Sequence, residues 1–227
     1  GLEAVSKGVL SDVVAEASPN NPLTVLSGPN LAVELAKAVP TAAVVASDDE
    51  QVAEQVRSLF MNPTYRVYVS GDVKGVELAG SLKNVMAIAA GMSDGLGFGD
   101  NTKGALLARG LNEMARLGVK LGASAETFMG VAGVGDLFAT AASTLSRNYR
   151  VGRALGEGRT LDMALEEIGQ VAEGVTTSRI ASEVAAEIGV EAPITNVMRQ
   201  VVDGDLSAND AVASLMERAP AKEGFFS

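Results

Sequence analysis

Residues 75–92, which read GVELAGSLKNVMAIAAGM, decide the fold of this chain. From Val85 onward the segment is apolar on every side, and a helix that is apolar all round is buried. We therefore expect a core helix here. At helical spacing, Lys83 shares its face only with uncharged residues, which are Val76, Ala79, Gly80, Met86, Ala87 and Ala90.

Lys83 is the first candidate for chemistry. An ammonium among Ala, Gly and Met side chains must pair with an acid, extend to solvent or lose its proton. A buried lysine that exchanges its proton near neutral pH can serve as a general acid or base. The alternative is a purely structural lysine that pairs with a buried carboxylate or reaches a nearby rim, and spacing alone leaves both open.

The composition limits the classes of function. The chain has 227 residues, 47% of them hydrophobic and 20% charged, which suits one large domain or two small ones. Its net charge of −10 argues against a nucleic-acid partner and against an anionic membrane surface. No run of about 18 apolar residues lacks charge, so we expect no membrane span.

The chain contains neither cysteine nor histidine. We therefore expect no disulfide and no metal site of the zinc type. The absence of histidine also removes the commonest general base, and this increases the weight on Lys83.

The first third of the sequence alternates between helical and extended patterns. Helices are predicted at 5–17, at 30–38 and at 50–60, with Asp48 and Asp49 as caps of the last; strands are predicted at 23–26, 41–46 and 65–69. Alternation with short linkers favours a mostly parallel sheet.

After Asp72 the pattern is helical, apart from a possible extended piece near Gln170. Helices are predicted at 73–91, 103–121, 136–140, 148–155, 161–168, 176–188, 194–203 and 208–217. We therefore place a boundary between an α/β layer, 1–72, and an all-helical domain, 73–227. No G-x-G-x-x-G follows a strand, so the binding half for any dinucleotide is expected outside this chain.

Two further segments are candidates for a site. In GVAGVGDL, 130–137, three glycines allow close backbone approach to a ligand, although a plain N-cap role for Asp136 in a tight turn is favoured on this signal alone. Ser146, Arg147 and Asn148 open a helix, where a helix N-terminus and a guanidinium suit a phosphate; an ordinary cap and a solvated charge are the alternative. The methionines Met86, Met92, Met114 and Met129 are expected to fill gaps in the core.

Five stretches together resemble a known family: LSGPNLAVELA, GVELAGSLKNVMAIAAGMSDGL, NTKGALLARGLNEMARLG, GVGDLFATAASTLSRNYRVGRALGEG and GQVAEGVTTS. The chain resembles the bacterial NAD(P)-dependent glycerol-3-phosphate dehydrogenases without their N-terminal cofactor region, from about residue 1 to about residue 217. The resemblance implies a partial Rossmann-type α/β layer followed by an all-α domain like the C-terminal domain of 6-phosphogluconate dehydrogenase. It also implies NAD or NADP as cofactor, a small phosphate substrate, and glycerophospholipid precursor synthesis in the cytoplasm.

The resemblance assigns roles to individual residues, with Lys83 as the proton acceptor and donor on the substrate oxygen. The substrate positions that it implies are Gly28, Asn30, Lys83, Asp136, Ser146, Arg147 and Asn148, the last three forming the phosphate group. The cofactor positions that it implies are Ala32, Arg147, Val171 and Glu173, of which Val171 and Glu173 reach the ribose end. Asn84 and Thr140 are expected to support these residues from behind.

The sequence also departs from the family pattern. Asn30 stands where the family usually has Ser or Thr, and ATAAS, 139–143, replaces a stretch that contains cysteine. The second active-site lysine of the family would immediately precede Gly1. We therefore expect the isolated chain to be inactive or nearly so.

Two alternatives to this function stay open at the level of sequence. The first is a related dehydrogenase that acts on another hydroxy acid. The second is a truncated, non-catalytic binding or assembly module, whose apolar helices could also support a homodimer.

Overall fold

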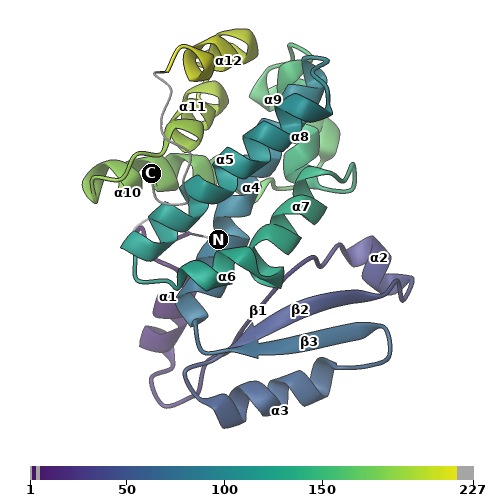
Figure 1. Ribbon diagram of the computed structural model, residues 1–227, viewed down its shortest axis with the longest axis vertical. Coiled ribbons are helices and arrows are strands. Elements are labelled where there is room, and N and C mark those ends of the chain that lie inside the picture. The colour runs from purple at the N-terminus through teal and green to yellow at the C-terminus, as the bar shows by residue number, and fades with distance from the viewer. Residues whose placement is uncertain (1, 4–5, 219–227) are drawn as a thin grey trace.

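The core helix predicted from residues 75–92 is α4, Val73–Gly95, and it runs through the middle of the helical domain (Figure 1). In this computed structural model, residues 2–3 and 6–218 are described. Every residue from Val85 to Ser93 is buried, as the apolar pattern predicts. The helices after it are α5, Asp100–Lys120; α6, Ala125–Met129; η1, a π-helix at Val131–Gly135; α7, Asp136–Ala141; α8, Arg147–Gly156; α9, Leu161–Ile168; α10, Glu173–Glu187; α11, Pro193–Val202; and α12, Ala208–Met216.

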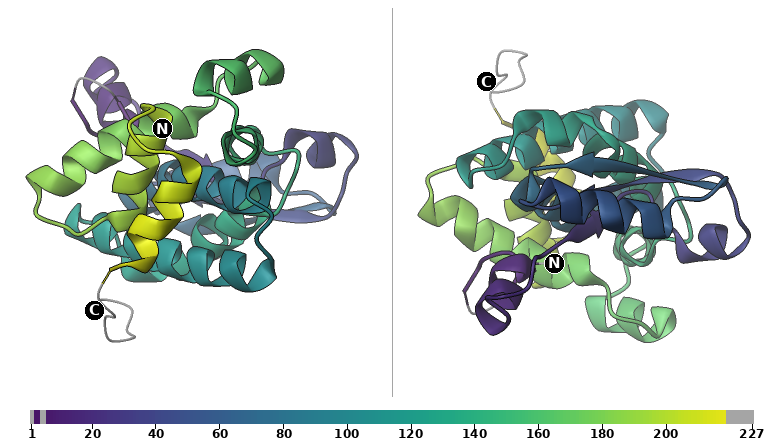
Figure 2. Two further views of the ribbon diagram at one scale, coloured as in Figure 1. Left: turned by 90° about the horizontal axis from the view of Figure 1, so that it is seen from above. Right: turned by 90° about the horizontal axis from the view of Figure 1, so that it is seen from below.

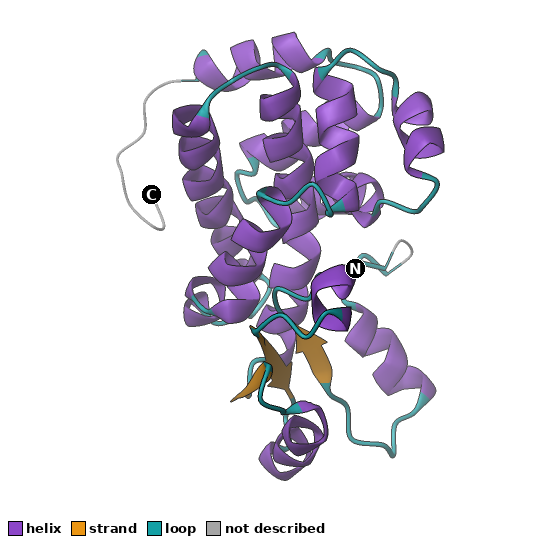
Figure 3. Cartoon of the chain, turned by 90° about the vertical axis from the view of Figure 1, so that its right-hand side faces the viewer, coloured by secondary structure: helices purple, strands orange, loops and turns teal. Residues whose placement is uncertain are grey.

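The α/β layer lies at one end of the helical domain (Figure 3). Its sheet has the order β1-β2-β3, formed by Val25–Ser27, Thr41–Ala46 and Tyr65–Ser70. Helix α3, Glu50–Phe60, contributes Ala53 to a cluster with β2 and β3, and Asp49 caps its first turn. The opposite face of β2 packs on Val76 of α4 and on Ala132 of η1.

The expectation of a mostly parallel sheet is wrong for one of the two strand pairs. Strands β2 and β3 are parallel, but β1 and β2 are antiparallel. The connections differ: α3, with 11 residues, returns the chain along the sheet, whereas the connection that contains α2, Ala32–Ala36, brings it back at the end where β1 finishes. A parallel pair needs a connection that runs the length of the sheet, and only the α3 connection does so.

Several predicted boundaries are also wrong. The helix expected at 30–38 is only α2, and the one expected at 5–17 is α1, Leu10–Ala17; residues 4 and 5 lie outside the described part. Lys7 has a φ of 56° and Leu2 bridges Val9, so the chain turns before α1 begins. The piece near Gln170 is a short connection without a strand, and α10 begins at Glu173.

The segment before the sheet packs on the helical domain (Figure 2). Val9 is buried in the main hydrophobic core, and the backbone N–H of Ser11 donates to both carboxylate oxygens of Glu77 on α4, at 3.1 and 3.2 Å. Lys7 pairs with Glu183 and Glu187 of α10, and these bonds raise the pKa of Lys7. Lys7, Val9 and Ser11 therefore hold this segment against α4 and α10.

Helices α4 and α8 approach each other more closely than side chains would permit. A Cβ added at Gly152 of α8 would lie 1.9 Å from the carbonyl oxygen of Ile88 on α4. A Cβ at Gly91 of α4 would lie 2.0 Å from the carbonyl oxygen of Tyr149 on α8. This contact sets the separation between the helix of Lys83 and the helix that follows Ser146.

Gly152→Ala tests this close approach. We expect it to lower the free energy of unfolding by about 3 kcal/mol, the upper part of the usual range for overpacking, because only backbone surrounds the new methyl group. Gly104→Ala on α5 is the matched control, since a Cβ there meets nothing within 4 Å. It should stabilise the protein by about 0.5–1 kcal/mol through helix propensity. Urea unfolding of both variants measures the contrast, and equal effects would contradict the packing argument.

Helix α11 is capped by a side chain from α5. Glu113 is 1% exposed, and its carboxylate accepts the backbone N–H groups of Ile194 and Thr195, each at 2.8 Å. The hydroxyl of Thr195 donates to it at 2.5 Å. Because α11 has no side-chain cap of its own, this carboxylate satisfies two N–H groups of its first turn.

Burial raises the pKa of Glu113, and the three hydrogen bonds act in the opposite direction. The contribution of this group to stability is therefore full below the ordinary value of 4.5 and is lost as the pH rises through the folded-state pKa. We expect the free energy of unfolding, taken relative to Glu113→Gln, to increase from pH 7 towards pH 5. Urea unfolding of both proteins across this range gives the slope, and a slope of opposite sign would refute the assignment.

Candidate active site

Lys83 pairs with Asp136 across the helical domain. The Lys83 Nζ donates to Asp136 Oδ2, which joins α4 to α7 over 53 positions of sequence. The side chain of Lys83 is 16% exposed, whereas that of Asp136 is 1% exposed. An ammonium has three hydrogens, and the partial exposure of Lys83 leaves it able to donate to a further oxygen.

Asp136 has a second set of partners. Its Oδ1 accepts the hydroxyl of Thr140 at 3.2 Å, and the backbone of Gly28 also hydrogen-bonds this carboxylate. Burial raises the pKa of Asp136, while the nearby Lys83 charge and these hydrogen bonds act to lower it. The residues from three elements thus hold one carboxylate in place beneath Lys83.

The interpretation of Asp136 as a plain N-cap is wrong. The preceding glycine-rich stretch forms η1, a π-helix that runs directly into α7, and Gly135 before Asp136 is already in the right-handed helical region. A Cβ at Gly133 would lie 2.1 Å from the carbonyl oxygen of Phe128, so the wide turn requires glycine there. Single π-turns of this kind occur often at functional sites, and here the turn directs Asp136 inward.

The SGPN turn after β1 supplies one member of this cluster. Gly28 has a φ of 141°, and a Cβ there would lie 2.9 Å from the Cα of Ala43, so only glycine brings this backbone to Asp136. Asn30 instead accepts the hydroxyl of Tyr65 at 2.8 Å, and Ala32 is exposed at the start of α2. Within the described residues, no hydrogen bond joins Asn30 or Ala32 to the Lys83–Asp136 pair.

Helix α8 begins with the three residues singled out in the sequence. Ser146 is its N-cap and accepts the backbone N–H of Tyr149 at 3.2 Å, so Ser146 is a structural cap. Arg147 is exposed, and no hydrogen bond or ion pair holds its guanidinium among residues 2–3 and 6–218. The first N–H groups of a helix have no partner within it and carry partial positive charge, which Arg147 reinforces.

Asn148 is turned inward, unlike its neighbour Arg147. Its Nδ2 donates to Asn84 Oδ1 at 2.9 Å, and its Oδ1 accepts the backbone N–H of Gly174 at 2.9 Å. Val171 and Glu173, at the start of α10, are exposed. The structure thus brings Lys83, Asp136, Gly28 and Thr140 together in one group. Asn148 links the start of α8, which carries Ser146 and Arg147, to the start of α10.

Sequence reasoning missed a polar cluster at the far end of α4. The hydroxyl of Tyr149 donates to Asp94 Oδ2 at 2.6 Å, and Lys103 pairs with the same oxygen at 2.6 Å. Burial and this hydrogen bond raise the pKa of Tyr149 to about 12. A tyrosine next to Arg147 and Asn148, in a helix rich in glycine, was the available signal for this anchor of α8.

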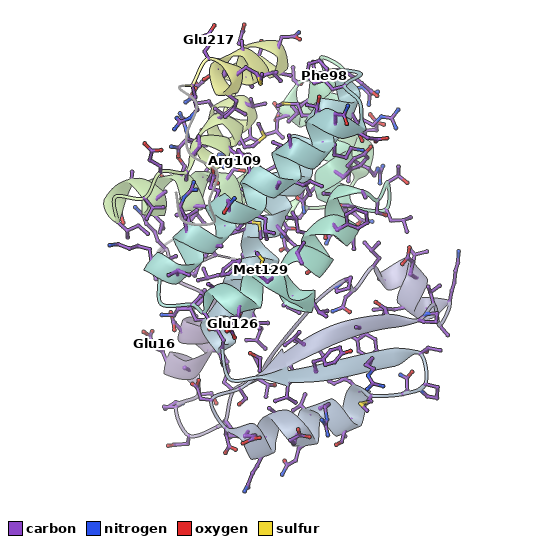
Figure 4. The ribbon with its side chains drawn as sticks, viewed as in Figure 1. Glu16, Phe98, Arg109, Glu126, Met129 and Glu217 are labelled. Atoms are coloured by element: carbon purple, nitrogen blue, oxygen red, sulfur yellow. The ribbon has the colours of Figure 1, made fainter. Side chains whose placement is uncertain are left out.

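One of the four methionines expected in the core is on the surface. Met86, Met92 and Met114 are buried, as predicted, whereas Met129, labelled in Figure 4, is 46% exposed. Met129 ends α6, a short helix that the sequence patterns did not indicate.

The described residues contain no group of three or more Asp or Glu side chains placed to hold a metal ion. None of their helices is long and apolar enough to cross a membrane.

The fold defines a class of protein in which a small α/β layer packs on a helical domain, and the Lys83–Asp136 pair lies where the Gly28 turn of that layer meets α4 and α7. Residues 72–213 match the family model for the C-terminus of NAD-dependent glycerol-3-phosphate dehydrogenase, and residues 1–53 match the model for its N-terminus. The chain belongs to the NAD-dependent glycerol-3-phosphate dehydrogenase family.

Curated relatives support this membership. Glycerol-3-phosphate dehydrogenase [NAD(P)+] of Desulfitobacterium hafniense is 48% identical over 223 residues, which cover 98% of this chain and 63% of the relative. The enzyme of the same name from Paracidovorax citrulli is 48% identical, with 98% of this chain and 66% of the relative covered. The chain thus spans slightly less than two thirds of the length of these relatives.

Solved structures show the same fold. The crystal structure of glycerol-3-phosphate dehydrogenase from Coxiella burnetii superposes with a TM-score of 0.91 at 41% identity, over 94% of this chain and 66% of that one. The yeast enzyme superposes with a TM-score of 0.83 at 29% identity, over 96% of this chain and 66% of that one. The expected fold class, a partial Rossmann-type layer followed by an all-α domain, is confirmed.

Proposed function

We propose that this chain is the substrate side of an NAD(P)-dependent enzyme that interconverts glycerol 3-phosphate and dihydroxyacetone phosphate. The observation that carries the proposal is the Lys83–Asp136 pair, which presents a partly exposed ammonium from an otherwise buried helix. Family membership and the names of the relatives support the same reaction. We also propose that a boundary at residue 72 separates the remainder of the cofactor domain from the substrate domain.

The proton chemistry is assigned to Lys83. When the ketone is reduced, the ammonium of Lys83 donates a proton to the oxygen as hydride reaches the carbon; when the alcohol is oxidised, the neutral amine accepts the hydroxyl proton as hydride leaves the same carbon. The nicotinamide, when bound, accepts or supplies that hydride. Asp136 keeps Nζ in position, and Thr140 with Gly28 fixes the carboxylate, so the acid–base group does not reorganise during the reaction.

The phosphate end of the substrate is assigned to the start of α8. Arg147 offers a planar fork of donors that matches two phosphate oxygens, and the N-terminus of a helix adds backbone N–H groups. Ser146 shapes this terminus as its cap. The exposed guanidinium, which is not engaged with the described residues, is available for such a ligand.

The residues on the cofactor side suit a contact with part of a dinucleotide. Val171 is 72% exposed, and Glu173 and Ala32 are also on the surface, so none of them needs to leave a core to meet a ligand. A ribose hydroxyl is a suitable partner for the Glu173 carboxylate. NAD or NADP is proposed as the cofactor, and cytoplasmic location and a homodimer are proposed with it.

The experiment that tests the function uses the full-length protein. Dihydroxyacetone-phosphate-dependent oxidation of NADH and of NADPH is followed by absorbance, beside small 2-oxo acids at the same concentration. We expect turnover with dihydroxyacetone phosphate alone. Preference for a 2-oxo acid would indicate a related dehydrogenase, and no turnover with any of these compounds would indicate a binding or assembly module.

A further inference from the structure

Helix α10 begins without a cap of its own. Its N-cap residue is Ala172, which has no side-chain oxygen to accept the free N–H groups of the first turn. Gly174, the second residue of the helix, is buried, so water does not readily replace the missing acceptor. An uncapped N–H in this position costs stability unless another element supplies an oxygen.

Asn148 of α8 supplies that oxygen and continues the chain of bonds inward. The Gly174 N–H donates to Asn148 Oδ1 at 2.9 Å, and Asn148 Nδ2 donates to Asn84 Oδ1 at 2.9 Å. Asn84 Nδ2 in turn donates to the carbonyl oxygen of Gly80 at 3.2 Å. The series runs from α10 through α8 to α4 and ends at Gly80, within one turn of Lys83.

The junction leaves no room for adjustment at Gly174. A Cβ at this position would lie 2.6 Å from the carbonyl oxygen of Asn84 and 2.8 Å from Asn148 Oδ1. Asn84 and Asn148 are themselves 6% and 8% exposed, so both amides are held by packing as well as by hydrogen bonds. The first turn of α10 is therefore fixed against α4 and α8 together.

We propose that Asn148 is a positioning residue for the cofactor side of the site. Its side chain holds the turn that carries Glu173 in register with the helix that carries Lys83. This inference rests on the proposed function, in which Glu173 meets the cofactor and Lys83 meets the substrate. It differs from a direct phosphate contact, because it makes the binding of the cofactor depend on Asn148 even when no substrate is present.

The test is NADH and NADPH binding to the full-length protein without substrate, followed by nucleotide fluorescence. We expect Asn148→Ala to weaken binding of the preferred cofactor about tenfold, the usual size for loss of a hydrogen bond to a buried group. Gly174→Ala keeps the backbone N–H but places a Cβ 2.6 Å from the carbonyl oxygen of Asn84 and 2.8 Å from Asn148 Oδ1, so it should displace the same turn and weaken binding at least as much. Thr160→Ala is the control, because it removes the N-cap bond to Met163 in α9, which involves none of these residues, and should change binding less than twofold.

The double variant completes the test. Gly174→Ala already displaces the first turn of α10 from Asn148, so if Asn148 acts by holding that turn, adding Asn148→Ala weakens binding no further than Gly174→Ala alone. Additive losses, an equal loss in Thr160→Ala, or unchanged cofactor binding in a folded Asn148→Ala protein would each overturn the positioning role. If the wild-type protein turns over dihydroxyacetone phosphate and the variants bind the cofactor as well as the wild type does, only this inference is refuted. If the wild-type protein binds neither nucleotide, the proposed function is refuted as well.

Discussion

Lys83→Ala is expected to lower the kcat of the full-length protein for dihydroxyacetone phosphate by about 10³-fold, within the range of about 10²–10⁴ typical of general acid–base groups. The loss should appear mainly in kcat, because the proton is transferred in the transition state and not in the bound ground state. Steady-state kinetics with the preferred nucleotide gives both constants.

The matched control for this variant lies on the same helix. Lys74 is exposed near the start of α4, and no ion pair in the described part of the chain involves it. Lys74→Ala should therefore leave kcat within about twofold, because exposed charges contribute little to structure. A Lys83→Ala protein with turnover near that of Lys74→Ala would end the assignment of Lys83 as the acid–base group.

Loss of folding is separated from loss of catalysis by a second variant. Lys83→Ala leaves Asp136 buried without its cation, and breaking a buried pair from one side costs about 3–5 kcal/mol. Lys83→Ala combined with Asp136→Asn removes the buried charge. The amide oxygen of the new side chain can still accept the hydroxyl of Thr140. The double variant should recover stability in urea unfolding and should remain inactive.

Elements with a strong local pattern could be predicted from the sequence. The strand Thr41–Ala46 and the helix Leu161–Ile168 match their predicted bounds residue for residue. The first is a short β-branched run after a proline, and the second is an amphipathic helix with a threonine cap and a following glycine. Helix α4 was found from its apolar circumference, which needs no knowledge of its partners.

Elements that depend on distant contacts could not be predicted in the same way. The antiparallel direction of β1 depends on the end of the sheet to which the connection through α2 returns, and a propensity pattern does not report that. The π-helix η1 forms where Gly133 meets the backbone of Phe128, whereas its glycines alone suggested a tight turn. Such elements are fixed by packing, not by their own sequence.

The site shows the same division. Lys83 could be singled out because its face carries no other charge, but its partner Asp136 is 53 positions away and its own pattern favoured an N-cap. Only the family resemblance implied that Asp136 lies beside the substrate. The sequence could not show that the Asn148 side chain points inward while that of Arg147 points to solvent. Helix geometry places the two residues on different faces, but it does not say which other element each face contacts. The roles assigned to these residues remain predictions that the following kinetics can decide.

Arg147→Lys is expected to lower kcat/KM for dihydroxyacetone phosphate by about 10–100-fold, mostly through a higher KM, although the charge is retained. A lysine places a single ammonium where the guanidinium offers two parallel donors, and a charged hydrogen bond is worth about 1.5–3 kcal/mol. Arg150→Lys is the matched control, because Arg150 is exposed one turn further along α8, past the helix N-terminus. It should retain kcat/KM within about twofold, since only the first turn presents free N–H groups.

The phosphate dependence of this loss distinguishes a phosphate contact from a general disturbance of α8. Dihydroxyacetone lacks the group that Arg147 is proposed to hold, so Arg147→Lys should turn it over at the low rate of the wild-type protein. The difference between the two substrates then isolates the interaction of the side chain with the phosphate, in the manner of a double-mutant cycle. If both substrates lose rate equally, Arg147 acts on the cofactor or on the helix, and the phosphate must be bound elsewhere. If only the phosphorylated substrate is affected, the guanidinium of Arg147 holds the phosphate at the start of α8.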